Sequence, residues 1–334
     1  MTWSAHLVRW KPATAALLLA AIFCPGAKAA DKVTLLLDWV PSGPYSFLYG
    51  GAEAGIFKSQ GIELEIKRGF GSSDTVSKLA AGTGDFGTGG IAAAMLAKAQ
   101  SKSDVVAILP LYVSGPHAIF TLAKSGIKSF KDLEGRKVAT SPYTSSNIFW
   151  PAVLKANNVD AGKIQIVHME AGVLTSALAT GNVDAIIEWT VNRPDIDRIV
   201  SSRGQTTNVM TFAGSGVDVY ELSLLASKKR LDANPDLAKR VVKATVESVY
   251  WCRDHIDDCA AALKKSVPES DLAGNVAGMR ESLALMLNPT TEKLGGFGKF
   301  NAEHLAGTWT AVAQSQGLDA GIDPQSFIDV RFLP

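Results

Sequence analysis

The sequence contains few of the residues on which metal binding and covalent catalysis usually depend. Of its 334 residues, three are cysteine and five are histidine. His117, His168, His255 and His304 are spread along the chain without the spacing of metal ligands. No serine elbow, Cys–His nucleophile pair or Walker loop is present. We therefore expect no metal site, no cofactor and no enzymatic activity.

An excess of charge and a long apolar run are also missing. The 33 Lys and Arg residues nearly balance the 32 Asp and Glu residues, so the chain has no general attraction for nucleic acid or an anionic membrane. The apolar run from Ala13 to Phe23 covers about eleven residues, whereas a membrane-spanning helix needs roughly twenty. No long apolar stripe predicts a partner surface, and we expect a monomer.

The first thirty residues have the pattern of a secretory signal peptide. Arg9 and Lys11 precede the apolar core, and Ala27 to Ala30 provides a small-residue cleavage site before Asp31. We expect residues 1–30 to be removed and the mature protein to be soluble in the periplasm. Processing would change the net charge from +1 to about −2, because only basic residues are lost.

Two cysteines, Cys252 and Cys259, remain after this processing. In an oxidising compartment an isolated pair is more often bonded than free. Seven residues of straight helix rise roughly 10 Å, but a disulfide needs Cα atoms within about 7 Å. A bond therefore requires a corner between the two cysteines, with Asp257 as the candidate N-cap of a second helix. We expect the disulfide, and two buried thiols are the alternative.

The pattern Leu-Ala-x-Gly-x-x-Asp occurs at 79–85 and again at 178–184. Each copy predicts a helix end, a left-handed glycine and an aspartate that opens a short apolar strand. The order of apolar and amphipathic segments around the two copies is also similar. The chain is therefore predicted to contain the same βαβ unit twice, in two lobes with a cleft between them.

The remaining patterns predict an α/β protein in which each lobe has a mainly parallel sheet flanked by helices. Residues 31–115 and 216–334 should form the first lobe, and residues 116–215 the second. The chain would cross between the lobes near 112–117 and 213–220, and two crossings form a hinge. The expected strands are 33–37, 62–66, 86–88, 105–109, 118–123, 136–139, 164–168, 185–187 and 223–226. The expected helices are 46–57, 73–81, 91–100, 145–157, 173–180, 193–201, 235–253, 282–287 and 303–314.

Several segments resemble the NMT1/THI5-like group of periplasmic substrate-binding proteins. The resemblance rests on Leu37 to Pro41, on Glu53 to Phe57, on Gly61 to Leu64 and on Leu133 to Val138, together with both repeat copies and the closing Phe332-Leu333-Pro334. It implies a type II periplasmic binding protein fold that closes on a small molecule and delivers it to the permease of an ABC importer. The Asp-Trp pair after the first strand is most similar to the branch that binds thiamine pyrimidine precursors.

Ligands of open α/β sheets bind beyond the carboxyl ends of the strands, so loops after strands supply the candidate contacts. Asp38 and Glu188 can accept hydrogen bonds from ligand N–H groups, and Trp39 and Trp189 offer flat faces for stacking. Capping or core roles are the alternatives for each of these residues. The other candidates lie in loops, at helix starts or at the crossings: Tyr45, Ser72, Ser73, Gly90, Tyr143, Ser145, Glu170 and Tyr220.

Together these features predict a receptor for a small, flat, nitrogen-containing ligand, for example a thiamine pyrimidine precursor. A receptor for alkanesulfonate, taurine or nitrate is the main alternative, favoured if the serine-bearing helix starts face the cavity. A pyrimidine-synthesising enzyme on the same fold is a remote alternative, because the cysteine-rich motif of the fungal enzymes is missing. A sensor domain for a signalling partner also remains open.

Overall fold

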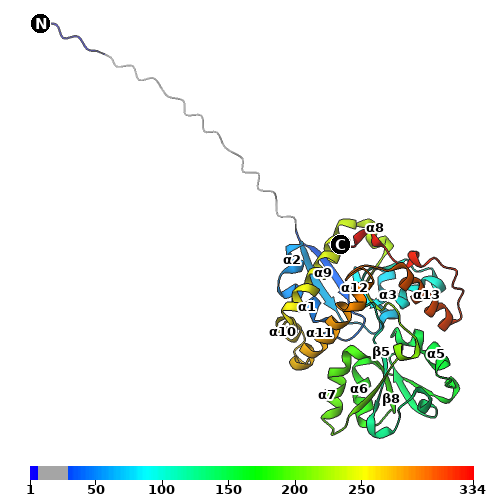
Figure 1. Ribbon diagram of the computed structural model, residues 1–334. Coiled ribbons are helices and arrows are strands. Elements are labelled where there is room, and N and C mark those ends of the chain that lie inside the picture. The colour runs from blue at the N-terminus through cyan, green and yellow to red at the C-terminus, as the bar shows by residue number, and fades with distance from the viewer. Residues whose placement is uncertain (7–28) are drawn as a thin grey trace.

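The computed structural model describes residues 1–6 and 29–334. The expected signal peptide, residues 1–30, lies mostly outside the described residues. None of the described helices is long and apolar enough to cross a membrane. The folded part forms two lobes, with α5, α6 and α7 in one and α1, α9 and α13 in the other (Figure 1).

The sheet of the first lobe has the strand order β2-β1-β3-β10-β4. Its strands are β1 (Asp31–Leu36), β2 (Ile62–Lys67), β3 (Phe86–Gly90), β4 (Val105–Pro110) and β10 (Leu222–Ser227). Only β10 runs antiparallel to its neighbours. The continuous apolar run of β4 is completely buried, as expected for a strand covered on both faces.

The sheet of the second lobe has the order β7-β6-β8-β5-β9. Its strands are β5 (His117–Leu122), β6 (Lys137–Thr140), β7 (Gln165–His168), β8 (Ala185–Trp189) and β9 (Thr207–Thr211). Here β5 is the antiparallel strand. In each sheet the fourth strand in the spatial order, β10 or β5, is the one that follows a crossing from the other lobe. The two sheets therefore have the same topology. The predicted two-lobed, mainly parallel fold is confirmed.

The two copies of the repeat make the same hydrogen bonds. Asp85 accepts a bond of 2.8 Å from the Thr34 amide of β1, and Asp184 accepts one of 2.8 Å from the Lys137 amide of β6. The glycine of each copy, Gly82 and Gly181, has a φ of +75° after the helix end. Each aspartate thus fixes the start of one strand against its parallel neighbour, which explains why the pattern recurs.

Helices cover both sheets, and most of them agree with the sequence predictions. They are α1 (Ser46–Glu53), α2 (Ile56–Ser59), α3 (Ser72–Ala80), α4 (Ile91–Ser101), α5 (Ser146–Ala156), α6 (Ala171–Thr180), α7 (Arg193–Ser201), α8 (Lys228–Ala233), α9 (Pro235–Asp254), α10 (Ile256–Ser266), α11 (Leu272–Met286), α12 (Pro289–Lys293) and α13 (Ala302–Gln316). The expected helix 46–57 is interrupted, because Gly55 adopts a left-handed φ of +76°. The predictions missed β9, α8, α12 and the first ten residues of α11, and they included α10 only as the second helix required by the disulfide.

Cys252 and Cys259 form the predicted disulfide, with Cα atoms 5.9 Å apart. The chain turns its corner at His255, between α9 and α10. The expected N-cap, Asp257, lies instead in the first turn of α10, so that detail of the prediction was wrong. The disulfide is buried where α9 and α10 pack against α1 of the first lobe.

The two lobes touch each other on both sides of the crossing segments. Helix α7 of the second lobe packs against α11, and α5 packs against α13. Two hydrogen bonds join the loops directly, from the Ser73 amide to the Tyr143 carbonyl (3.0 Å) and from the Ser141 hydroxyl to the Phe70 carbonyl (3.2 Å). The structure is therefore that of a closed form. The lobe boundaries expected at 115/116 and 215/216 remain predictions.

Candidate functional site

A narrow cavity of about 10 Å³, room for roughly one water molecule, lies between the two lobes. The first lobe contributes Asp38, Trp39, Pro44, Tyr45 and Ser72, the second contributes Thr144, Glu188, Trp189, Val191 and Asn192, and the first crossing segment contributes Tyr112. Asp38 and Trp39 follow β1, Ser72 opens α3 after β2, and Glu188 and Trp189 end β8. The cavity is therefore at the carboxyl ends of the strands, where open α/β sheets bind ligands.

The Asp38 carboxyl group accepts three hydroxyl hydrogen bonds. Tyr45 and Thr88 donate to Oδ1, both at 2.9 Å, and Ser72 donates to Oδ2 at 3.0 Å. Burial raises the pKa of Asp38, and the three hydroxyl donors partly oppose that rise. The arrangement orients the carboxyl group rigidly, with Tyr45 held beside it in the cavity wall.

Glu188 occupies the opposite wall, at the end of β8. Its Oε2 accepts hydrogen bonds of 3.0 Å from the Trp189 amide and from the Asn192 side chain. Burial raises the pKa of Glu188 to about 7, and hydrogen bonding by Asn192, the Trp189 amide and Trp39 partly opposes that rise. Trp39 of the first lobe and Glu188 of the second thus line the same cavity.

Aromatic rings form much of the remaining cavity surface. Trp189 meets Tyr112 edge to face, with ring centroids 6.2 Å apart, and the Tyr112 hydroxyl is 2.7 Å from that of Ser282. The Nε1–H of Trp189 is buried and has no hydrogen-bond partner among the described residues. Two indoles and two phenol rings thus supply much of the cavity wall, and their flat faces suit a planar ligand.

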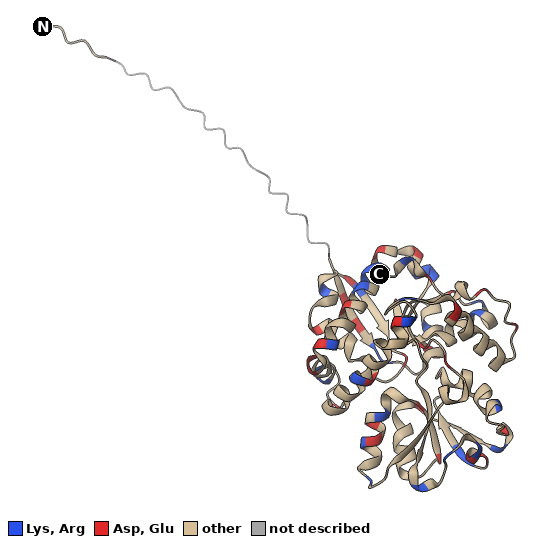
Figure 2. Ribbon diagram, viewed as in Figure 1, with Lys and Arg blue, Asp and Glu red and all other residues tan. Residues whose placement is uncertain are grey.

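None of the described residues that line the cavity is Lys or Arg. Charged residues of both signs are instead interspersed over the helices of both lobes (Figure 2). The two ionisable acids of the cavity, Asp38 and Glu188, are almost completely buried, with exposed fractions of 2% and 6%. An anionic ligand would meet two carboxyl groups without a compensating cation, whereas a ligand rich in N–H groups would meet acceptors.

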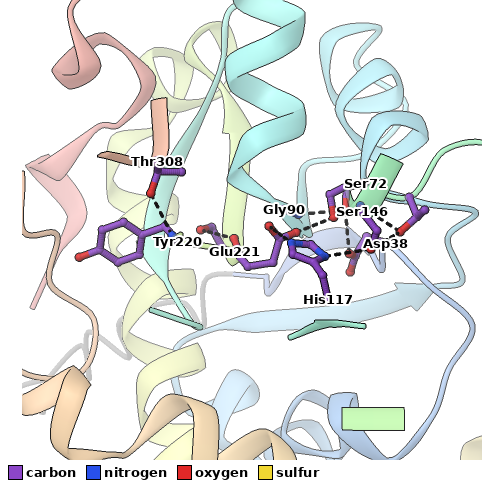
Figure 3. Close-up of polar contacts among 11 residues, drawn as sticks. Asp38, Ser72, Gly90, His117, Ser146, Tyr220, Glu221 and Thr308 are labelled. Atoms are coloured by element: carbon purple, nitrogen blue, oxygen red, sulfur yellow. Dashed lines mark hydrogen bonds and ion pairs between the residues drawn. The ribbon is translucent and has the colours of Figure 1, made fainter. Parts of the chain in front are cut away.

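A second polar cluster lies directly behind the cavity, where the crossing segments end (Figure 3). Glu221 accepts a hydrogen bond of 2.6 Å from Ser145 at Oε1, and its Oε2 is 3.2 Å from Nε2 of His117. Nδ1 of His117 is 2.9 Å from the Ser146 hydroxyl. All four residues are completely buried. The cluster thus joins both crossings to the start of α5.

This cluster is also connected to the cavity. The Gly90 amide donates a hydrogen bond of 2.9 Å to the Ser72 hydroxyl, which in turn donates to Asp38. Gly90 packs so tightly against Glu221 that a Cβ atom would overlap its Oε1. A path of direct contacts therefore runs from Asp38, through Ser72 and Gly90, to Glu221.

The structure brings six of the twelve candidate ligand contacts to the cavity: Asp38, Trp39, Tyr45, Ser72, Glu188 and Trp189. The other six lie outside it. Gly90 and Ser145 contact Glu221, and the Ser73 amide binds the Tyr143 carbonyl. Tyr220 packs against Phe300 and His304, away from the cavity.

Tyr143 and Glu170 line a separate, shallower groove at the junction of the lobes. Tyr143 has an exposed fraction of 51%, although its backbone carbonyl accepts a hydrogen bond from the first lobe. For the six candidates outside the cavity, a role in ligand contact remains a prediction. In this structure they contact other protein groups or lie at the surface.

Sequence reasoning did not select Thr144, Val191 and Asn192, which line the cavity from the second lobe. Asn192 lies four residues after Glu188, in the turn that follows β8. This short spacing from a selected residue was the signal that could have identified it. No cluster of metal-binding side chains occurs among the described residues.

Residues 44–258 match the family model described as NMT1/THI5 like. The formylaminopyrimidine-binding protein of Halalkalibacterium halodurans is 22% identical over 83% of this chain and 83% of its own length. The riboflavin-binding protein RibY of Chloroflexus aurantiacus is 24% identical over 97% and 92%. Among solved structures, the alkanesulfonate-binding protein SsuA of Xanthomonas axonopodis pv. citri matches with a TM-score of 0.68 and 13% identity, over 91% of this chain and 100% of that one.

Proposed function

The chain belongs to the NMT1/THI5-like family, and from that membership we propose that it is the periplasmic substrate-binding component of an ABC importer. Its ligand is a small, flat, nitrogen-containing molecule of the kind represented by thiamine pyrimidine precursors. Two of its relatives are named for binding formylaminopyrimidine and riboflavin, and both of these ligands are flat nitrogen heterocycles.

One observation carries the ligand class: the cavity contains two buried carboxyl groups and two indoles but, among the described lining residues, no Lys or Arg. Asp38 and Glu188 accept hydrogen bonds from ring or amine N–H groups at the edge of the ligand. Trp39 stacks on a face of the ligand, and Trp189 borders its edge on the side of the second lobe. Closure removes water from these contacts and offers a membrane permease a surface that only the loaded receptor presents.

The binding of taurine, alkanesulfonate or nitrate is the competing proposal, and a structural neighbour is named for alkanesulfonate binding. Anion binding of this kind requires that the serine hydroxyls at helix starts face the ligand. The Ser72 hydroxyl is instead bound to Asp38, and the Ser145 hydroxyl is bound to Glu221. The negative charge of an anion in this cavity would also raise the free-energy cost of ionising the two buried carboxyl groups.

A calorimetric and thermal-shift comparison tests the proposal. The mature protein is titrated with aminopyrimidines, riboflavin, taurine and nitrate. We expect binding of the heterocycles, and we expect Trp39→Ala and Glu188→Gln to weaken it about tenfold or more. Trp251→Ala is the matched control, since Trp251 stacks on His255 and does not line the cavity. Stabilisation by taurine and nitrate alone would refute the proposal.

We also propose that the protein binds its ligand without converting it. Chromatography of the bound pyrimidine after long incubation with stoichiometric protein should recover it unchanged. Formation of a new compound would instead support the alternative of a pyrimidine-synthesising enzyme on this fold.

A further inference from the structure

One of the two cavity tryptophans, Trp189, has an indole N–H group that is not used. This N–H is buried and has no hydrogen-bond partner among the described residues, and the residue as a whole is 8% exposed. Trp189 lines the cavity, and its N–H is a buried donor that no described residue uses.

The two aromatic neighbours of Trp189 do not accept a hydrogen bond from its indole N–H. His117 packs edge-on against it, but both ring nitrogens of His117 are engaged, by Ser146 and by Glu221. Tyr112 is the other ring neighbour; its hydroxyl donates to Ser282, which itself donates to the Pro44 carbonyl, and it makes no hydrogen bond with the indole. A buried donor without a partner costs free energy when closure removes water from it. An acceptor atom on the bound molecule would remove that cost.

We propose that Trp189 is a specificity-determining residue whose N–H selects ligands with a hydrogen-bond acceptor at the edge that faces the second lobe. This inference rests on the proposed function and narrows its ligand class. The preferred ligand carries N–H donors for Asp38 and Glu188 and, in addition, a ring nitrogen or carbonyl oxygen for Trp189. An amino-substituted nitrogen heterocycle satisfies both requirements, whereas an aryl amine of the same shape satisfies only the first.

A pair of probes that differ in this acceptor tests the inference. 4-Aminopyrimidine and aniline are titrated calorimetrically into wild-type protein and into Trp189→Phe, at a slightly alkaline pH that keeps both probes neutral. Phenylalanine keeps an aromatic face but removes the donor. Wild type should prefer 4-aminopyrimidine by about tenfold or more, and Trp189→Phe should reduce that preference to about twofold. Trp251→Phe, outside the cavity, should keep the wild-type preference.

A spectroscopic measurement on wild-type protein does not depend on whether the variant folds. In protein labelled with ¹⁵N at tryptophan, the indole N–H resonance of Trp189 should move downfield with 4-aminopyrimidine and much less with aniline. Equal affinities for the two probes in wild type, or an unchanged preference in Trp189→Phe, would overturn this inference and leave the proposed function standing. A wild type that binds no flat nitrogen compound would refute the proposed function, and the inference with it.

Discussion

Nε2 of His117 lies 3.2 Å from Oε2 of Glu221, and this contact joins the ends of the two segments that connect the lobes (Figure 3). Both side chains are completely buried. Ser145 and Ser146 at the start of α5 bind the same pair, so the second lobe is attached to both crossings through one polar cluster. The geometry of closure therefore depends on a few hydrogen bonds directly behind the cavity.

Replacement of Glu221 tests how much this cluster contributes to stability. Glu221→Ala leaves His117 and Ser145 buried without their acceptor, and we expect it to lower the free energy of unfolding by about 3 kcal/mol. Glu221→Gln can still accept from Ser145 and can donate to the other tautomer of His117, so its loss should be less than half as large. Urea denaturation measures both values. Equal losses in the two variants would contradict the hydrogen-bond account.

Gly90 should not tolerate a side chain. A Cβ atom there overlaps Glu221 and Ser145, so Gly90→Ala is expected to lower the free energy of unfolding by about 1–3 kcal/mol. Gly172→Ala is the matched control, because Gly172 lies in α6 with open space around it. It should be neutral or stabilising by up to about 1 kcal/mol, since alanine favours the helix. Urea denaturation of both variants makes the comparison, and a loss at Gly172 equal to that at Gly90 would contradict it.

The pKa of Glu188, raised to about 7 by burial, predicts a dependence of stability on pH. The neutral form is favoured in the folded protein, so the stabilisation is present at low pH and is lost as the pH rises toward about 7. We expect the free energy of unfolding to fall by as much as about 3 kcal/mol between pH 5 and pH 8 through this group. Glu188→Gln should lack that part of the change. Identical pH profiles of wild type and variant would show that Glu188 is not responsible.

The disulfide should matter for stability and not for binding. It joins α9 to α10 against α1 and does not line the cavity. The double variant Cys252→Ala, Cys259→Ala removes a constraint on a short loop of the unfolded chain, with an expected loss of about 2–3 kcal/mol. Thermal unfolding with and without reductant measures the effect. Ligand affinity at low temperature should not change, and a large loss of affinity would show that the disulfide shapes the cavity.

Most of the fold could be predicted because its signals are local. The buried apolar runs, the two copies of Leu-Ala-x-Gly-x-x-Asp and the amphipathic pattern of the expected helix 235–253 depend on residues a few positions apart. The strand β9 was missed because Thr207–Thr211 is only partly buried and has a mixed composition. The start of α11 was missed because its glycines and alanines give a weak amphipathic pattern.

The candidate site was predicted only in part. Asp38, Trp39, Glu188 and Trp189 could be found because each follows or ends a predicted strand, a position that parallel sheets turn toward the ligand. Gly90 and Ser145 satisfy the same positional rule, yet they contact Glu221 and not the cavity. Position along the chain could not reveal this difference, because it depends on where the second crossing segment returns.

By itself the sequence determined the two lobes, the repeated unit, the disulfide and the acids and indoles placed after strands, since each follows from short-range pattern and covalent distance. The tertiary structure alone decided which of those side chains share one cavity. It also decided that Glu221 joins both crossings, and that the indole N–H of Trp189 has no hydrogen-bond partner among the described residues. These outcomes depend on contacts between residues more than a hundred positions apart, and their geometry arises only when the two lobes pack against each other.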